Sequence, residues 1–230
     1  MSRINENTVK AEGQVSLSEV ITVRESGSGL RVLFVGNSIT KHEPAPAIGW
    51  HGNWGMAASS EETDYVHVAV SLLEEKYGAV DYMICHAAKW ERNFWDISVL
   101  DIFSAARDFA ADVVIIRLGD NMWNVRDEFE KHDMVSHYTE MVSFFASKPE
   151  AKVIVTDLFW RGEPIDSIIH EAAKRAGYTL VEIGDLGENE ENMAIGRFEH
   201  RGVSVHPGDL GMRRIAERIV EKYNSVPKKI

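Results

Sequence analysis

Three polar side chains of this sequence stand at the ends of apolar stretches and have the types that acyl-transfer chemistry needs. Ser38 follows the run Val-Leu-Phe-Val-Gly-Asn, Asn121 follows residues 115–118, and His206 precedes Pro207. A serine hydroxyl becomes a strong nucleophile when a histidine takes its proton. An amide side chain can stabilise the oxyanion that forms when the serine attacks a carbonyl group. These residue types are therefore candidates for nucleophilic catalysis by a serine.

The position of Ser38 favours this chemistry. Residues 32–35 form a continuous apolar run, which is typical of a strand covered on both faces by helices. In sheets of that kind, ligands bind just beyond the carboxyl ends of the strands. Gly36 allows the chain to turn sharply at this point. We therefore expect Ser38 at the carboxyl end of a central strand.

His206 is one of nine histidines, so its selection depends on its place in the chain. Pro207 and Gly208 put it on a loop that enters a final helix, and that helix is predicted from apolar residues at helical spacing between 212 and 223. A histidine that only caps the helix is the simpler alternative for this position. For Asn121, the simpler alternative is an ordinary turn residue.

Apolar strands and helical segments alternate along the chain. The predicted strands lie at about residues 32–35, 80–85, 112–118, 152–157 and 178–183. Five short strands separated by helices predict an α/β fold, a three-layer α/β/α sandwich around a five-stranded parallel sheet with right-handed crossovers. Before these strands, Val15, Leu17, Ile21 and Val23 alternate with polar residues and predict one or two edge strands.

Three short motifs, in order, resemble the SGNH (GDSL-type) hydrolase family. The Gly-Asp-Ser block of that family corresponds to Gly36-Asn37-Ser38, and its Gly-x-Asn-Asp block corresponds to Gly119-Asp120-Asn121, with Met122 in place of the second acid. Its Asp-x-x-His block matches at His206, with Val203 in the acid position. The glycine of the second block has no counterpart between Cys85 and Arg92. The resemblance covers residues 30–223 and implies a flavodoxin-like SGNH hydrolase fold.

The resemblance also implies a role for each matching residue. Ser38 would be the nucleophile and His206 the base, while the Ser38 amide and the Asn121 side chain would hold the oxyanion. A third donor would come from residues 88–91. Because Val203 replaces the aspartate that orients the histidine, we expect either the Val203 carbonyl or the Glu199 carboxylate to do so.

The tryptophans follow the predicted strands. Trp50 and Trp54 come after the first, Trp90 and Trp95 after the second, Trp123 after the third and Trp160 after the fourth. At least half of them are expected to be buried residues that fix long loops. Trp90 and Trp123 are the two that we predict to contact a substrate, with a flat face toward a sugar ring.

These features predict a serine esterase that removes a small acyl group, most simply acetyl, from a carbohydrate. A lipase or thioesterase of the same fold is the alternative enzyme. A ligand-binding module that has lost catalysis is the alternative outside enzymes, and the absent glycine and the absent acid at Val203 favour it. No cofactor is expected.

A metal site is the main rival to serine chemistry. Asp120, Asp157, His86 and His206 all lie at predicted strand ends and carry possible ligand atoms. No pair of histidines occurs at the spacing His-x-x-x-His, which zinc sites on helices commonly use. We therefore predict no metal ligands. The segment Gly36-x-Ser38-x-Thr40 lacks the second glycine of an α/β-hydrolase elbow.

Length and charge set the remaining expectations. The chain has 230 residues, which suits one catalytic domain at 30–230 preceded by an N-terminal extension at 1–29. A net charge of −11 argues against nucleic acid or an anionic membrane as a partner. The single cysteine, Cys85, and an N-terminus without an apolar signal-like stretch predict a cytoplasmic protein. The expected partner is a small-molecule ester, and the sequence leaves the oligomeric state open.

Overall fold

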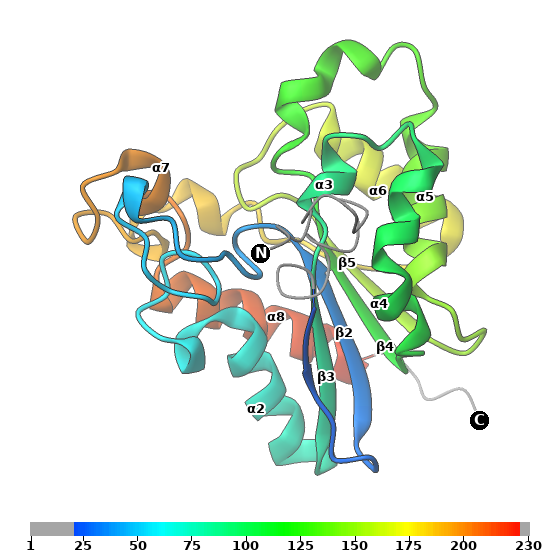
Figure 1. Ribbon diagram of the computed structural model, residues 1–230, viewed down its shortest axis with the longest axis horizontal. Coiled ribbons are helices and arrows are strands. Elements are labelled where there is room, and N and C mark those ends of the chain that lie inside the picture. The colour runs from blue at the N-terminus through cyan, green and yellow to red at the C-terminus, as the bar shows by residue number, and fades with distance from the viewer. Residues whose placement is uncertain (1–20, 226–230) are drawn as a thin grey trace, which may run out of the picture.

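The computed structural model describes residues 21–225, which build a sheet between two layers of helices (Figure 1). The strands are β1 (Ile21–Arg24), β2 (Leu30–Gly36), β3 (Val80–His86), β4 (Val113–Arg117), β5 (Lys152–Thr156) and β6 (Thr179–Val181). Their order across the sheet is β1-β3-β2-β4-β5-β6. Strands β2 to β6 run parallel, so the predicted five-stranded parallel sheet is confirmed.

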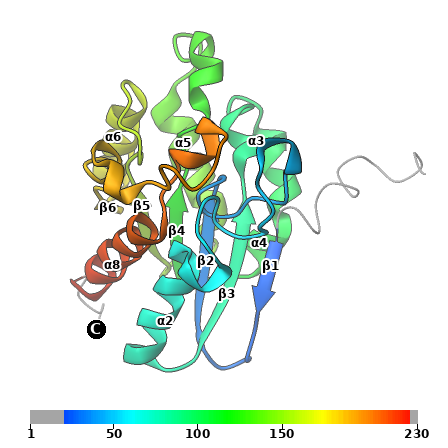
Figure 2. The same cartoon turned by 90° about the vertical axis from the view of Figure 1, so that its left-hand side faces the viewer.

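β1 is an antiparallel strand added at one edge of the parallel sheet. β1 pairs with β3, and Figure 2 shows β1 and β6 at opposite edges of the sheet. This strand contains Ile21 and Val23, two of the four residues that predicted an edge strand. The other two, Val15 and Leu17, lie outside the described residues.

The helices divide into two layers. α2 (Tyr65–Tyr77) and α8 (Asp209–Ser225) cover one face, whereas α3 (Ala88–Glu91), α4 (Ser104–Asp108), α5 (Met134–Phe145) and α6 (Ile165–Ala176) cover the other (Figure 1). Successive strand side chains point to opposite faces. Accordingly, Leu33 and Val35 pack under α5 and α6, while Val32 and Phe34 pack under α2 and α8.

Burial on both faces explains the continuous apolar runs. All five residues of β4 are buried, and so are residues 32–36 of β2. These two strands pair with each other in the middle of the sheet, so the carboxyl end of β2 opens onto the loops that follow β3 and β4. Within residues 21–225, no helix has the length and apolar character needed to cross a lipid bilayer.

Candidate active site

Ser38 lies two residues beyond β2, in a tight turn at the carboxyl end of the sheet. The amides of Thr40 and Lys41 donate to the carbonyl of Asn37 at 2.9 and 3.0 Å, which closes the turn. Gly36 is required because a Cβ at that position would lie 1.8 Å from Thr40 Oγ1. The strand end and the turn together present a half-buried Ser38 where the sequence predicts it.

His206 reaches Ser38 from the other end of the chain. It lies between α7 (Arg201–Ser204) and α8, and its carbonyl accepts a hydrogen bond of 2.9 Å from the amide of Ala194. Its Nε2 atom is 2.9 Å from Ser38 Oγ, although the two residues are 168 positions apart. The structure therefore brings the predicted nucleophile and the predicted base into hydrogen-bonding contact.

A backbone carbonyl orients the imidazole. Nδ1 of His206 lies 2.6 Å from the carbonyl oxygen of Gly202, so Nδ1 carries the proton and donates it, and the Nε2 lone pair faces Ser38. The sequence-based prediction of Val203 or Glu199 for this role was wrong. The Val203 carbonyl instead accepts the backbone amide of His206 at 3.0 Å.

The surroundings of Val203 and Glu199 explain this correction. The side chain of Val203 is fully buried in an apolar cluster with Trp50, Met56 and Ala194, where a carboxylate would have no partner. Glu199 is exposed and lines a surface cavity with residues 46–49. The acceptor for Nδ1 is instead the carbonyl of Gly202, which lies within α7.

The electrostatic environment keeps His206 neutral. Burial lowers its pKa to about 4, against the opposing effects of the Gly202 carbonyl and the charge of Asp120. An imidazole with this pKa is unprotonated at neutral pH and can accept the proton of Ser38. The nearby Asp120 carboxylate would stabilise the imidazolium once it forms.

Trp160 is the aromatic residue in contact with the imidazole. Its ring lies edge-on to His206, with the centroids 5.0 Å apart, and its Nε1 donates to the Val205 carbonyl at 3.3 Å. The indole comes from the loop after β5 and contributes to the desolvation of His206. It was among the six tryptophans at strand ends, but it was not one of the two predicted to contact substrate.

The two tryptophans predicted to contact substrate lie in different environments. Trp90 is 1% exposed and packs edge-on against Tyr138 in the core, so its assignment to substrate binding was wrong. Trp123 is 38% exposed, with its ring over Gly162 and under the guanidinium of Arg126. The position of Trp90 after a strand end did not indicate that its side chain, on α3, points into the core.

A buried glutamate lies at the end of α3, in the region where the second-block glycine of SGNH hydrolases has no counterpart. Glu91 accepts hydrogen bonds from the Asn121 side chain (2.6 Å to Oε2), the Gly119 amide (2.6 Å to Oε1) and the Asn37 side chain (3.0 Å to Oε1). Burial raises the pKa of this carboxyl, and the Asp120 charge does so too, whereas the three donors favour its ionised form. Glu91 thus connects the turns after β2 and β4.

Asn37 and Arg117 complete this buried network. The Asn37 side chain also donates to Asp120 Oδ2 at 3.0 Å and accepts a hydrogen bond from the Arg117 guanidinium. Arg117 Nη1 lies 3.0 Å from Asp120 Oδ2. Arg117 therefore pairs with Asp120, and Asn37 connects this ion pair to Glu91. An asparagine between them donates where an aspartate would add a third negative charge.

Several N–H groups near Ser38 are free to hold an oxyanion. Among the described residues, the Ser38 amide and the amides of Ala88 and Lys89 donate to no acceptor. Asn121 Nδ2 has two hydrogens, and Glu91 occupies one of them. The Gly36 carbonyl accepts from Ala87 at 2.7 Å, which brings the start of α3 next to the Ser38 turn.

Sequence reasoning missed Glu91, the Gly202 carbonyl and Trp160. A lone glutamate in Lys-Trp-Glu-Arg has the appearance of an exposed helix residue, so nothing local indicated burial. Every residue has a backbone carbonyl, so the sequence could not single out that of Gly202. Trp160 did carry a signal, because it follows the end of β5 closely.

No protein-family model matches this chain, and no curated protein matches it either. Solved structures do match in fold. A psychrotrophic esterase from Pseudoalteromonas sp., in a structure inhibited by monoethylphosphonate, is 13% identical with a TM-score of 0.51 over 85% of this chain and 97% of that one. A protein described as a GDSL-like lipase from Parabacteroides merdae is 15% identical with a TM-score of 0.54 over 84% and 95%.

A third similar structure belongs to a family two carbohydrate esterase from Cellvibrio japonicus. It is 13% identical, with a TM-score of 0.52, and the match covers 84% of this chain and 60% of that one. At these identities the likeness establishes the shared three-layer architecture. The chemistry must be argued from the side chains described above.

Proposed function

We propose that this chain, which has the fold of the SGNH (GDSL-type) hydrolases, is a serine esterase that removes a small acyl group from an alcohol. The observation that carries the proposal is the 2.9 Å contact between Ser38 Oγ and His206 Nε2 at the carboxyl end of the sheet, with Nδ1 held by Gly202. A base in the correct tautomer beside a serine is the arrangement that nucleophilic catalysis requires.

The reaction follows from these atoms. Ser38 Oγ attacks the ester carbonyl carbon while its proton moves to His206 Nε2. The oxyanion is stabilised by the Ser38 amide and the second hydrogen of Asn121 Nδ2. The tetrahedral intermediate collapses as the leaving alkoxide takes the proton from Nε2. Water then attacks the acyl-serine with His206 again as base, which releases the acid and restores Ser38.

An acetyl ester on a carbohydrate is the substrate class that we propose. Trp123 has an exposed indole and Trp160 borders the catalytic imidazole, so both can offer aromatic surface to a sugar ring. The fold likeness to a carbohydrate esterase agrees with this class. A lipase or thioesterase would instead require an apolar surface for a long acyl chain.

The test compares three ester substrates on the purified chain: an acetylated sugar, an aryl acetate and an aryl octanoate. We expect both acetyl esters to be hydrolysed, kcat/KM to be lower for the octanoate, and a saccharide to change the tryptophan fluorescence. The Ser38→Ala variant should be inactive on all three. Faster turnover of the octanoate, without a fluorescence response to any sugar, would favour the lipase or thioesterase.

A further inference from the structure

We infer that a single divalent transition-metal cation binds between Asp157, His170 and Glu182, at the β6 edge of the sheet and apart from Ser38. One ligand atom from each of these side chains lies within 4.8 Å of the others. Asp157 follows β5, His170 lies on α6 and Glu182 follows β6. The earlier candidates Asp120, His86 and His206 take no part.

Asp157 is the buried member of the three side chains. Asp157 is 5% exposed, and its Oδ1 accepts hydrogen bonds from the amides of Ile183 and Gly184 at 2.5 and 3.2 Å. The second oxygen, Oδ2, accepts no hydrogen bond within the described part of the chain and lies 3.6 Å from His170 Nε2.

His170 points at the same place. Its Nε2 atom is shielded from solvent, yet within residues 21–225 it has no hydrogen-bond partner. Zinc lies about 2.1 Å from nitrogen and oxygen ligands, so in tetrahedral geometry the ligand atoms are roughly 3.4 Å apart. The 3.6 Å between His170 Nε2 and Asp157 Oδ2 fits a cation between them.

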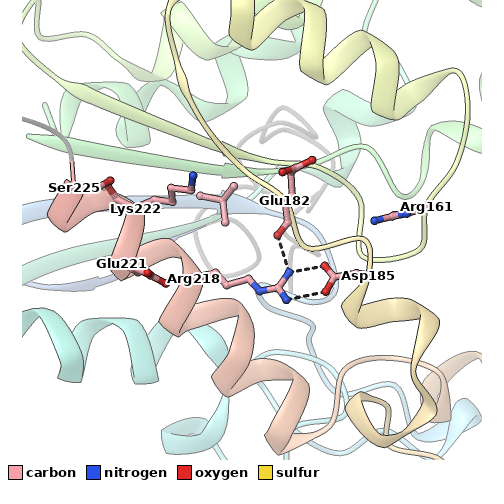
Figure 3. Close-up of a pocket in the computed structure, with 8 residues that line it drawn as sticks. Arg161, Glu182, Asp185, Arg218, Glu221, Lys222 and Ser225 are labelled. Atoms are coloured by element: carbon pink, nitrogen blue, oxygen red, sulfur yellow. Dashed lines mark hydrogen bonds and ion pairs between the residues drawn. The ribbon is translucent and has the colours of Figure 1, made fainter.

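Glu182 supplies the third ligand. Its carbonyl accepts a hydrogen bond of 2.8 Å from Arg218, and Figure 3 shows its carboxylate turned away from that guanidinium. Arg218 is instead held by both oxygens of Asp185 at 2.5 and 2.8 Å. The Glu182 carboxylate is therefore not paired with Arg218, and one of its oxygens lies within 4.8 Å of the ligand atom of His170 on α6.

The surrounding charges favour a cation. The three side chains line a cavity of about 420 Å³ together with Asp166, Glu163 and Arg161. Arg161 is the one positively charged side chain among these lining residues, and it pairs with Glu188 at 3.0 Å. A set of one imidazole and two carboxylates suits Zn²⁺ or another first-row cation better than Mg²⁺ or Ca²⁺, which prefer oxygen ligands alone.

A cation here would join the loop after β5 to β6 and α6. That loop begins at Asp157 and carries Trp160, which contacts His206. The bound ion would therefore stabilise one side of the catalytic site while taking no part in bond making.

The test measures Zn²⁺ binding by titration calorimetry and by the shift in Tm, with a tag-free, chelator-treated chain. We expect one Zn²⁺ per chain and a higher Tm. Binding should weaken by at least about tenfold in His170→Ala and Glu182→Gln, since loss of even an outer-shell partner typically costs that much. His200→Ala and Glu217→Gln serve as matched controls, because both residues are exposed and lie outside this cavity, and both variants should keep wild-type affinity.

Two results would overturn the assignment. One is the absence of Zn²⁺ binding to the wild-type chain. The other is unchanged affinity and stoichiometry in both His170→Ala and Glu182→Gln, which would place any bound zinc on other histidines. Neither readout depends on ester hydrolysis, so this experiment tests the metal site independently of the proposed activity.

Discussion

The Nδ1 atom of His206 lies 2.6 Å from the carbonyl oxygen of Gly202, four residues earlier in the chain. A neutral carbonyl can fix the imidazole tautomer, as a carboxylate does in a triad, but it does not supply a full negative charge. Part of that charge comes through space from Asp120, which raises the pKa of His206 against the effect of burial. This geometry is the basis for our proposal that Ser38 and His206 act as a dyad.

The dyad predicts that no carboxylate near the chain position of the family aspartate is essential. Glu199→Gln should change kcat by less than about twofold, as is usual for an exposed side chain away from special features. His206→Ala should abolish turnover under the same assay. A fall in kcat of about 10⁴ in Glu199→Gln, as when a triad aspartate is altered, would refute the dyad.

The pH dependence of kcat/KM should report the low pKa of His206. The base works only when neutral, so activity should fall as the pH decreases through a pKa of about 4 and should be level above it. Steady-state rates between pH 3.5 and 8 test this. An acidic limb near the ordinary histidine value of about 6.5 would contradict it.

Acid unfolding must be separated from that limb. Because folding lowers the pKa of His206, the unfolded chain binds the proton more readily between its ordinary pKa and about 4. The contribution of His206 to stability is therefore complete above the unfolded pKa and declines as the pH falls toward 4. Circular dichroism at each pH shows whether lost activity reflects protonation or unfolding.

Glu91 should act on catalysis by positioning Asn121. Asn121→Ala should lower kcat by about 10²–10³ with little change in KM, since an oxyanion donor acts mainly in the transition state. Glu91→Gln leaves the amide less firmly held and should lower kcat by a smaller factor. In an Asn121→Ala background, Glu91→Gln should have no further effect on kcat.

This double-mutant cycle separates positioning from general structural damage. Urea unfolding of each variant gives the loss of stability, which is compared with the loss of kcat. If Glu91→Gln lowers kcat equally in both backgrounds, Glu91 does not act through Asn121. An Asn121→Ala variant that changes only KM would make Asn121 a substrate-binding residue instead.

Asn37, at the position that corresponds to the aspartate of the SGNH Gly-Asp-Ser block, lies between two buried carboxylates. Asn37 donates to both Glu91 and Asp120, so Asn37→Asp would remove both hydrogen bonds and place a third buried carboxylate beside them, where Arg117 already pairs with Asp120. We expect a loss of about 3 kcal/mol in the free energy of unfolding, typical of an uncompensated buried charge. Thermal and urea unfolding measure it.

A compensating change tests the cause. Glu91→Gln combined with Asn37→Asp restores the wild-type number of charges and places an amide donor beside the new carboxylate. The double variant should be at least about 1 kcal/mol more stable than additive effects predict, which is a normal coupling for residues in contact. Strict additivity would show that charge does not determine the residue at position 37.

The fold was predictable because its signal is local and repeated. Residues 32–35 and 113–116 are apolar without interruption, and such runs are typical of strands covered on both faces. The pairing of β1 with β3 was not predictable, because the alternation of Ile21 and Val23 indicates an edge strand but does not indicate which strand it pairs with.

The site was predictable where chain position determines it. Ser38 follows a strand end and His206 precedes the last helix. The structure brings these two residues into hydrogen-bonding contact. The direction of a side chain after a strand end could not be predicted. Trp90 and Trp160 both follow strands, yet Trp90 is buried in the core and Trp160 contacts the His206 imidazole. Glu91 was missed because its burial depends on donors from Asn37, Gly119 and Asn121, which are distant in sequence.

The central claim is that Ser38 is a nucleophile activated by His206, and labelling with an organophosphonate tests it most directly. Intact mass spectrometry should show one phosphonyl group per wild-type chain, and none on Ser38→Ala or His206→Ala. Ser143→Ala, which removes an exposed serine of α5, should label like the wild type. Labelling of Ser38→Ala at the wild-type rate, or no labelling of the wild-type chain, would contradict the account.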